Sequence, residues 1–183
     1  MRWILLTLAI AGCAGAQCPE PVAARAAPTP PAAEPERRPA PSPNPPSGSI
    51  QVHPVRLEAE PMGGGVIMIL ADEEGRRQLP VVIGEAEAHV IDLRMRGETF
   101  ERPLTHDLLS TMIERLGARV LFVHVDKLES NVFVGSVVLW DGHDLQTFDS
   151  RTSDAVAIGL GHHAPIYVAP AVFERAADPF RGP

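Results

Sequence analysis

The chain has 183 residues, with 16 Lys and Arg against 23 Asp and Glu, so its formal net charge is −7 with histidine neutral. This length allows one domain with appended segments, because domains cluster at roughly 100 to 150 residues. Residues 50–183 alone carry 12 basic and 20 acidic side chains, a net charge of −8. Sequence-independent binding of nucleic acid depends on Lys and Arg that neutralise phosphates. The composition therefore excludes a protein that holds DNA through a basic surface alone.

The first 13 residues predict an export signal. A positively charged start precedes an apolar run, Trp3 to Ala11, which is far shorter than the roughly 20 residues that span a bilayer. The run ends in IAGC at residues 10–13, which resembles a bacterial lipobox, so Cys13 is expected to carry a lipid and begin the mature protein. Ordinary cleavage near Ala16, which would give a periplasmic or secreted protein, is the alternative. We therefore expect an exported protein, attached to the cell envelope through Cys13.

Residues 14–49 predict a disordered tether. Eleven of the 19 prolines fall between Pro19 and Pro46, and large apolar side chains are scarce there. Such a segment cannot bury enough surface to offset the entropy of ordering, and it favours an extended, polyproline-like chain. The tether would hold the following domain away from a membrane.

The sequence from residue 50 onward predicts a folded domain, residues 50–177, with a short tail at 178–183. In chain order the patterns predict strands at 50–60, 66–71 and 78–83, helices at 84–97 and 105–116, strands at 119–128, 131–140 and 144–149, a helix at 150–163, a strand at 164–168 and a short helix at 170–177. Pro54 predicts that the first strand lies at a sheet edge, and Thr105 is the expected N-cap of the second helix. Strands and helices without regular β-α-β alternation predict an α+β fold, with a mainly antiparallel sheet and three to four helices.

Three stretches of the domain resemble ordered motifs of the bifunctional nuclease (BFN) domain family. They are IGEAEA at 83–88, RPLTHDLL at 102–109 and DSRTSDAVAIGL at 149–160, the last followed by APIYV. The resemblance covers about residues 52–175. It implies an α+β fold, nuclease activity on DNA and RNA, and assembly into a homo-oligomer. One position departs from the family pattern, because Thr152 replaces a proline.

The resemblance also implies a reaction, phosphodiester hydrolysis, and with it a set of candidate residues. The reaction needs an activated water, neutralisation of developing charge and usually carboxylates that hold Mg²⁺ or Mn²⁺. The matched stretches contain these groups near helix N-termini, where backbone N–H groups can receive an anion. Candidate catalytic residues are Glu87, His106, Asp107 and Asp154; candidate phosphate-binding residues are Arg102, Thr105, Arg151 and Ser153; candidate ligands of a divalent metal are Glu85, Glu87, Asp149 and Asp154.

Structural roles compete with these assignments. A carboxylate in the first turn of a helix interacts favourably with the helix dipole without any ligand, Thr105 and Ser153 suit helix caps, and Arg151 could form an ion pair with Asp149.

The sequence therefore leaves two functions open. The first is an exported, metal-dependent nuclease that acts on DNA or RNA, and the second is a non-catalytic, oligomeric binding module on the same tether. The acidic balance and Thr152 favour the second, whereas the Glu, His, Asp and Arg pattern favours the first.

Overall fold

The computed structural model describes residues 38–61 and 63–177. The predicted signal peptide with Cys13, the first part of the predicted tether and the predicted tail at 178–183 lie outside the described residues. Seven strands and four helices follow in this order: β1 (Ile50–Ala59), β2 (Val66–Ala71), β3 (Gln78–Ile83), α1 (Glu85–Arg96), α2 (Thr105–Arg115), β4 (Arg119–Glu129), β5 (Val132–Trp140), β6 (Leu145–Arg151), α3 (Thr152–Gly161), β7 (Ile166–Val168) and α4 (Pro170–Ala177). None of the helices in this part of the chain is long and apolar enough to cross a bilayer.

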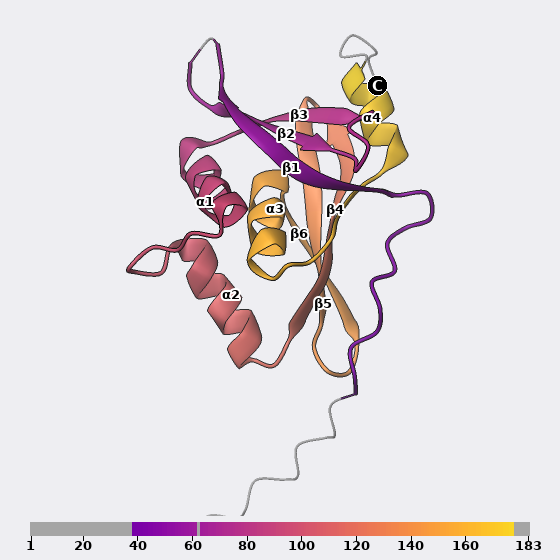
Figure 1. The fold of residues 1–183 in the computed structure, drawn as a ribbon. Coiled ribbons are helices and arrows are strands. Elements are labelled where there is room, and N and C mark those ends of the chain that lie inside the picture. Colours follow the sequence, from indigo (N-terminus) through magenta and orange to yellow (C-terminus); the bar gives the residue numbers. More distant parts are fainter. Residues whose placement is uncertain (1–37, 62, 178–183) are drawn as a thin grey trace, which may run out of the picture. The chain divides into compact units, whose positions relative to one another are not determined.

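The seven strands form one curled sheet in the order β3-β2-β1-β7-β4-β5-β6 (Figure 1). All neighbouring strands are antiparallel except β4 and β7, so the predicted α+β fold with a mainly antiparallel sheet is confirmed. The prediction of an edge position for the first strand is wrong, because β1 lies between β2 and β7. Its pairing with β2 shifts register between Pro54 and Arg56, and such an irregularity accommodates a residue without an N–H group.

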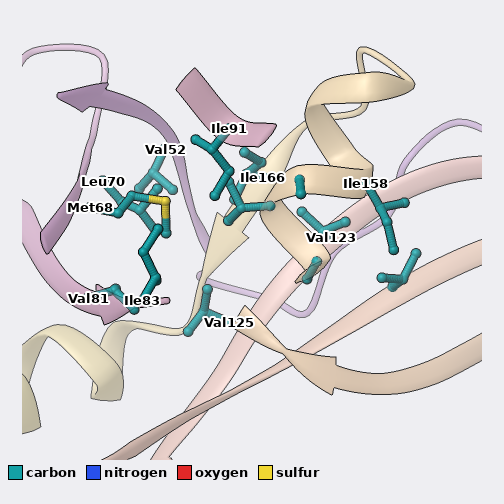
Figure 2. Close-up of a cluster of buried hydrophobic side chains, with 14 of the residues drawn as sticks. Val52, Met68, Leu70, Val81, Ile83, Ile91, Val123, Val125, Ile158 and Ile166 are labelled. Atoms are coloured by element: carbon teal, nitrogen blue, oxygen red, sulfur yellow. The ribbon is translucent and has the colours of Figure 1, made fainter. Parts of the chain in front are cut away.

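Helix α3 is the central helix of the domain. It contacts α1, α2 and the strands β4, β5 and β6 (Figure 1). Small residues permit this close packing: a Cβ added at Gly159 would lie 3.0 Å from Cγ2 of Val123 on β4. Ile158 of the same helix joins apolar side chains of β1, β2, β3, α1, β4 and β7 in the core shown in Figure 2. Because the core holds α3 on the sheet, it also fixes the position of the residues at the N-terminus of this helix.

The last twelve residues of the predicted tether, 38–49, contact the sheet. The backbone N–H of Arg38 donates to the carbonyl of Gly142 at 3.0 Å, and Nε1 of Trp140 donates to the carbonyl of Arg38 at 3.1 Å. At the other end of the segment, Oγ of Ser49 lies 2.9 Å from Nε2 of the buried His124. Strand β1 begins at Ile50, as predicted, but contacts with the domain begin twelve residues earlier.

A histidine with a largely buried side chain, His162 at the end of α3, predicts acid sensitivity. Burial lowers the pKa of His162, and the nearby Arg94 and His163 lower it further, against the opposing effect of Glu114. As the pH falls, the unfolded chain therefore takes up a proton at this histidine near pH 6.5, whereas the folded protein takes it up only at a lower pH. The free energy of unfolding consequently falls as the pH drops below about 6.5. We expect urea denaturation between pH 7 and pH 5 to show a steeper loss of stability for the wild type than for His162→Leu. Parallel curves would contradict this prediction, and the exposed His53→Leu should retain the wild-type slope.

Candidate active site

Three helices begin with the same arrangement of a carboxylate in the first turn. Glu87, Asp107 and Asp154 are each the third residue of α1, α2 and α3. The N-cap positions are held by Gly84, Leu104 and Arg151. The prediction that Thr105 is the N-cap of the second helix is therefore wrong, because Thr105 is the first residue of α2. Oδ2 of Asp107 accepts a hydrogen bond from the backbone N–H of Leu104 at 2.9 Å. This bond stabilises the start of the helix at Leu104, which has no hydroxyl group to serve as a cap.

Two of these carboxylates meet at one arginine. Arg151 donates from Nε to Oδ2 of Asp154 at 2.7 Å, and from Nη2 to Oε1 of Glu87 at 2.6 Å and to Oδ1 of Asp154 at 3.1 Å. Nε2 of His106, the second residue of α2, lies 2.9 Å from Oδ1 of Asp154. The network therefore joins the starts of α1, α2 and α3, which are far apart in the sequence. We call Glu87, His106, Arg151 and Asp154 the ionic cluster.

The two carboxylates and the histidine of the cluster are largely shielded from solvent, whereas the arginine is accessible. The side chains of Glu87, His106 and Asp154 are 13%, 14% and 24% exposed, whereas that of Arg151 is 66% exposed. Among the described residues, Nη1 of Arg151 has no hydrogen-bond acceptor, since only its Nε and Nη2 are bonded. Arg151 can therefore bind an anion through Nη1 while it stays paired with both carboxylates.

The charge state of Asp154 follows from its neighbours. Burial alone raises the pKa of Asp154, but hydrogen bonds from Arg151 and His106 and the charge of Arg151 outweigh burial, and the pKa lies below its ordinary value. The stability that this carboxylate contributes is therefore present above about pH 4 and is lost as the pH falls through the lowered pKa. Since an ionised carboxylate only accepts hydrogen bonds, the shared proton sits on Nε2 of His106. In the neutral form of the imidazole, the lone pair is then on Nδ1.

The four residues of the cluster line a cleft of about 950 Å³. The rest of the cleft is mainly apolar and is lined by Val90, Leu104, Leu109, Ile113, Leu116, Val137, Leu139, Phe148 and Ile158. Two further predicted residues, Thr105 and Asp149, also line it. The cleft therefore combines an arginine that can bind an anion and a histidine that can accept a proton with a surface suited to an apolar or aromatic group.

The structure separates the remaining predicted residues from this cleft. Glu85 is exposed at the first position of α1, and Arg102 is exposed in the loop before α2. Ser153 is 6% exposed and lines a different cavity. Neither these three nor Asp107 is among the residues that line the cleft.

Asp107 instead pairs with Arg94 of α1, which is not among the predicted site residues. Nη2 of Arg94 donates to Oδ1 of Asp107 at 2.8 Å, and Nη1 donates to the carbonyl of Ala157 in α3. Burial alone raises the pKa of Asp107, but hydrogen bonds from Arg94 and the Leu104 N–H outweigh it and lower the pKa. Arg94 therefore connects the three helices that carry the ionic cluster. A basic residue in the last turn of a helix usually signals a dipole partner, so the sequence pattern did not indicate this role.

The arrangement bears on the predicted metal site. Within residues 38–61 and 63–177, no three His, Cys, Asp or Glu side chains are disposed to hold one metal ion. The guanidinium of Arg151 lies between Glu87 and Asp154, so these carboxylates cannot share a cation unless Arg151 moves. The residues as arranged therefore do not fit a preformed Mg²⁺ or Mn²⁺ site, and the metal stays a prediction.

Thr152, the residue that departs from the family pattern, carries an unsatisfied hydroxyl. It is the first residue of α3 and 2% exposed, and its Oγ1 has no hydrogen-bond partner among the described residues. Proline suits the first position of a helix. Thr152→Pro removes the buried hydroxyl and restricts the unfolded chain, so we expect the free energy of unfolding to rise by about 1 kcal/mol. Chemical denaturation measures the change, and Thr152→Val isolates the effect of the hydroxyl; a less stable valine variant would contradict the explanation.

Sequence comparison finds relatives of this chain among known proteins. A sequence model of the bifunctional nuclease domain matches residues 68–180, a range that contains the starts of α1, α2 and α3. Two uncharacterized proteins from two strains of Mycobacterium tuberculosis are each 35% identical to this chain over 129 residues, which cover 70% of this chain and 76% of each relative. Bifunctional nuclease 2 of Oryza sativa subsp. japonica is 27% identical over 105 residues, which cover 55% of this chain and 32% of that protein.

Proposed function

Because the chain belongs to the bifunctional nuclease domain family, we propose that it is a nuclease that hydrolyses phosphodiester bonds of DNA or RNA in the cleft beside the ionic cluster. One observation carries the proposal. The three sequence stretches that resemble the family, each on a different helix start, contribute Glu87, His106, Arg151 and Asp154 to a single network that lines the cleft.

The cluster supplies two of the functions that the reaction needs. His106, oriented by the hydrogen bond from its Nε2 to Asp154, accepts a proton on Nδ1 from the attacking water. Arg151 binds the phosphate through Nη1 and stabilises the charge that develops on its oxygens. The new bond forms between the water oxygen and phosphorus, the bond from phosphorus to the leaving oxygen breaks, and that oxygen takes a proton from solvent. No step is carried through a metal, since the residues do not fit one as arranged.

A second candidate function is a binding module without chemistry. The observation that favours it is the pairing of Arg151 with two carboxylates, which leaves the cluster without excess positive charge. The rest of the cleft is mainly apolar. In this case the protein would bind nucleic acid or another ligand in the cleft and release it unchanged.

One assay separates the two candidates. The full chain is incubated with single-stranded and double-stranded DNA and with RNA, in Mg²⁺, in Mn²⁺ and in chelator, beside His106→Ala and the matched variant His53→Ala on the exposed face of β1. We expect cleavage by the wild type and by His53→Ala but not by His106→Ala. Cleavage that survives chelation supports the metal-free route, whereas cleavage that requires Mg²⁺ or Mn²⁺ supports the predicted metal. Absence of cleavage in every condition, with the protein folded, would favour the binding module.

Three other predictions remain separate from the activity. Export and lipid attachment at Cys13 lie outside the described residues and are tested by mass spectrometry of protein extracted from membranes, where a lipid mass on Cys13 is expected. A start of the mature protein after Ala16 would support the alternative cleavage. The homo-oligomer is tested by sedimentation of the full chain.

A further inference from the structure

A second cavity shares Arg151 with the cleft. It has a volume of about 500 Å³, and its other sides come from β3, from the turn between β4 and β5, from the start of α3 and from α4. Helix α4 contacts both β3 and β4 (Figure 1). Arg151 is therefore the boundary between two hollows, and only one of them contains His106.

The start of α3 is open toward a ligand. The helix has ten residues, and its N-cap, Arg151, makes no side-chain capping bond. The first N–H groups of a helix have no acceptor within the helix, and they carry the positive end of the helix dipole. These groups favour an anion, although a helix terminus alone does not define a site.

Ser153 supplies an independent indication of a ligand. This serine is the second residue of α3, it is 6% exposed, and it lines the second cavity. Its hydroxyl makes no hydrogen bond to any described residue. The hydroxyl oxygen is not among the fully enclosed, unpaired polar atoms of the described residues, so it is accessible from the cavity and can donate to a ligand there.

Arg175 gives the cavity a positive charge of its own. It lies exposed on α4, lines the cavity and forms no ion pair with the described residues. Arg151, by contrast, shares its charge with Glu87 and Asp154. The anion would therefore be held by Arg175, by the hydroxyl of Ser153 and by the first N–H groups of α3, with Nη1 of Arg151 at the boundary.

We propose that this cavity is a second phosphate subsite. On the basis of the proposed function, it binds the phosphate adjacent to the scissile one, so that a single strand passes over Arg151 with one phosphate in each hollow. The preferred substrate is then an oligonucleotide with at least two phosphodiesters rather than a dinucleotide.

Binding is tested first, without reference to cleavage. Inorganic phosphate is titrated into the ¹⁵N-labelled full chain while amide chemical shifts are recorded. We expect saturable shifts at Ser153 and Asp154, with an affinity that falls about tenfold in Ser153→Ala and in Arg175→Gln. It should stay unchanged in Arg76→Gln, because this arginine of the turn between β2 and β3 does not line the cavity. Absence of these shifts, or equal affinity in all variants, would overturn the proposal.

Substrate length provides the second test. The ratio of kcat/KM for a tetranucleotide to kcat/KM for a dinucleotide is measured for the wild type and for Arg175→Gln. We expect a ratio well above one that falls about tenfold in the variant, and a ratio near one in both proteins would overturn the subsite while the nuclease stands. Phosphate binding at Ser153 without cleavage of any substrate would instead support the subsite and contradict the nuclease.

Discussion

His106→Ala is expected to lower kcat for phosphodiester cleavage by about 10²- to 10⁴-fold, the usual contribution of a positioned general base. The hydrogen bond to the ionised Asp154 fixes the proton on Nε2 and leaves Nδ1 as the base, and alanine has no group that can replace it. Steady-state kinetics on the best substrate of the panel measure the loss. Because His106 lines the cleft and is not part of the hydrophobic core, the variant should stay folded, with a midpoint of thermal unfolding close to that of the wild type.

Added imidazole distinguishes catalysis from a structural role. A small base can enter the space that alanine leaves, so imidazole should restore part of the activity of His106→Ala and none of any activity missing from Asp154→Asn. His53→Ala controls for the loss of a histidine as such. Full activity of His106→Ala would remove His106 from the mechanism, and a folded, inactive variant that imidazole fails to restore would assign it a structural role.

The sequence predicted the positions of helices and strands along the chain better than it predicted which strands are neighbours in the sheet. Most helix and strand positions follow from local patterns, such as the left-handed Gly97 that ends α1 with a φ of 68°. The interior position of β1 depends on β7, a strand of three residues that pairs with β1 on one side and β4 on the other. No local pattern in β1 records a partner more than a hundred residues away, and Pro54 suggested an edge.

The candidate site shows the same division between local and long-range information. The family motifs identified Glu87, His106, Arg151 and Asp154, and the structure brings these four together. Asp107 has the same position in its helix as Glu87 and Asp154, but its partner is Arg94, so equal sequence context gives different surroundings. The role proposed for Arg175 depends on how α4 packs against β3, which periodicity along α4 does not encode.

Arg94→Met is expected to lower the free energy of unfolding by about 2 to 3 kcal/mol. The side chain of Arg94 is 10% exposed and bonds α2 through Asp107 and α3 through the carbonyl of Ala157. Methionine keeps the apolar stem but leaves Asp107 without its counter-charge. We place the loss below that of a fully buried pair, because the side chain of Asp107 is 40% exposed. Urea denaturation at pH 7 measures the change.

The neighbouring Arg96 provides the matched control for this prediction. It lies on the same helix and pairs with Asp92 at 2.5 Å, but both side chains are about half exposed. Arg96→Met should therefore cost less than about 0.5 kcal/mol. Since Asp107 follows His106 directly in α2, Arg94→Met should also reduce cleavage, although Arg94 does not line the cleft. Equal destabilisation by Arg94→Met and Arg96→Met would show that Arg94 does not connect the helices. Unchanged cleavage in a destabilised Arg94→Met protein would show that Asp154 alone holds His106 in position.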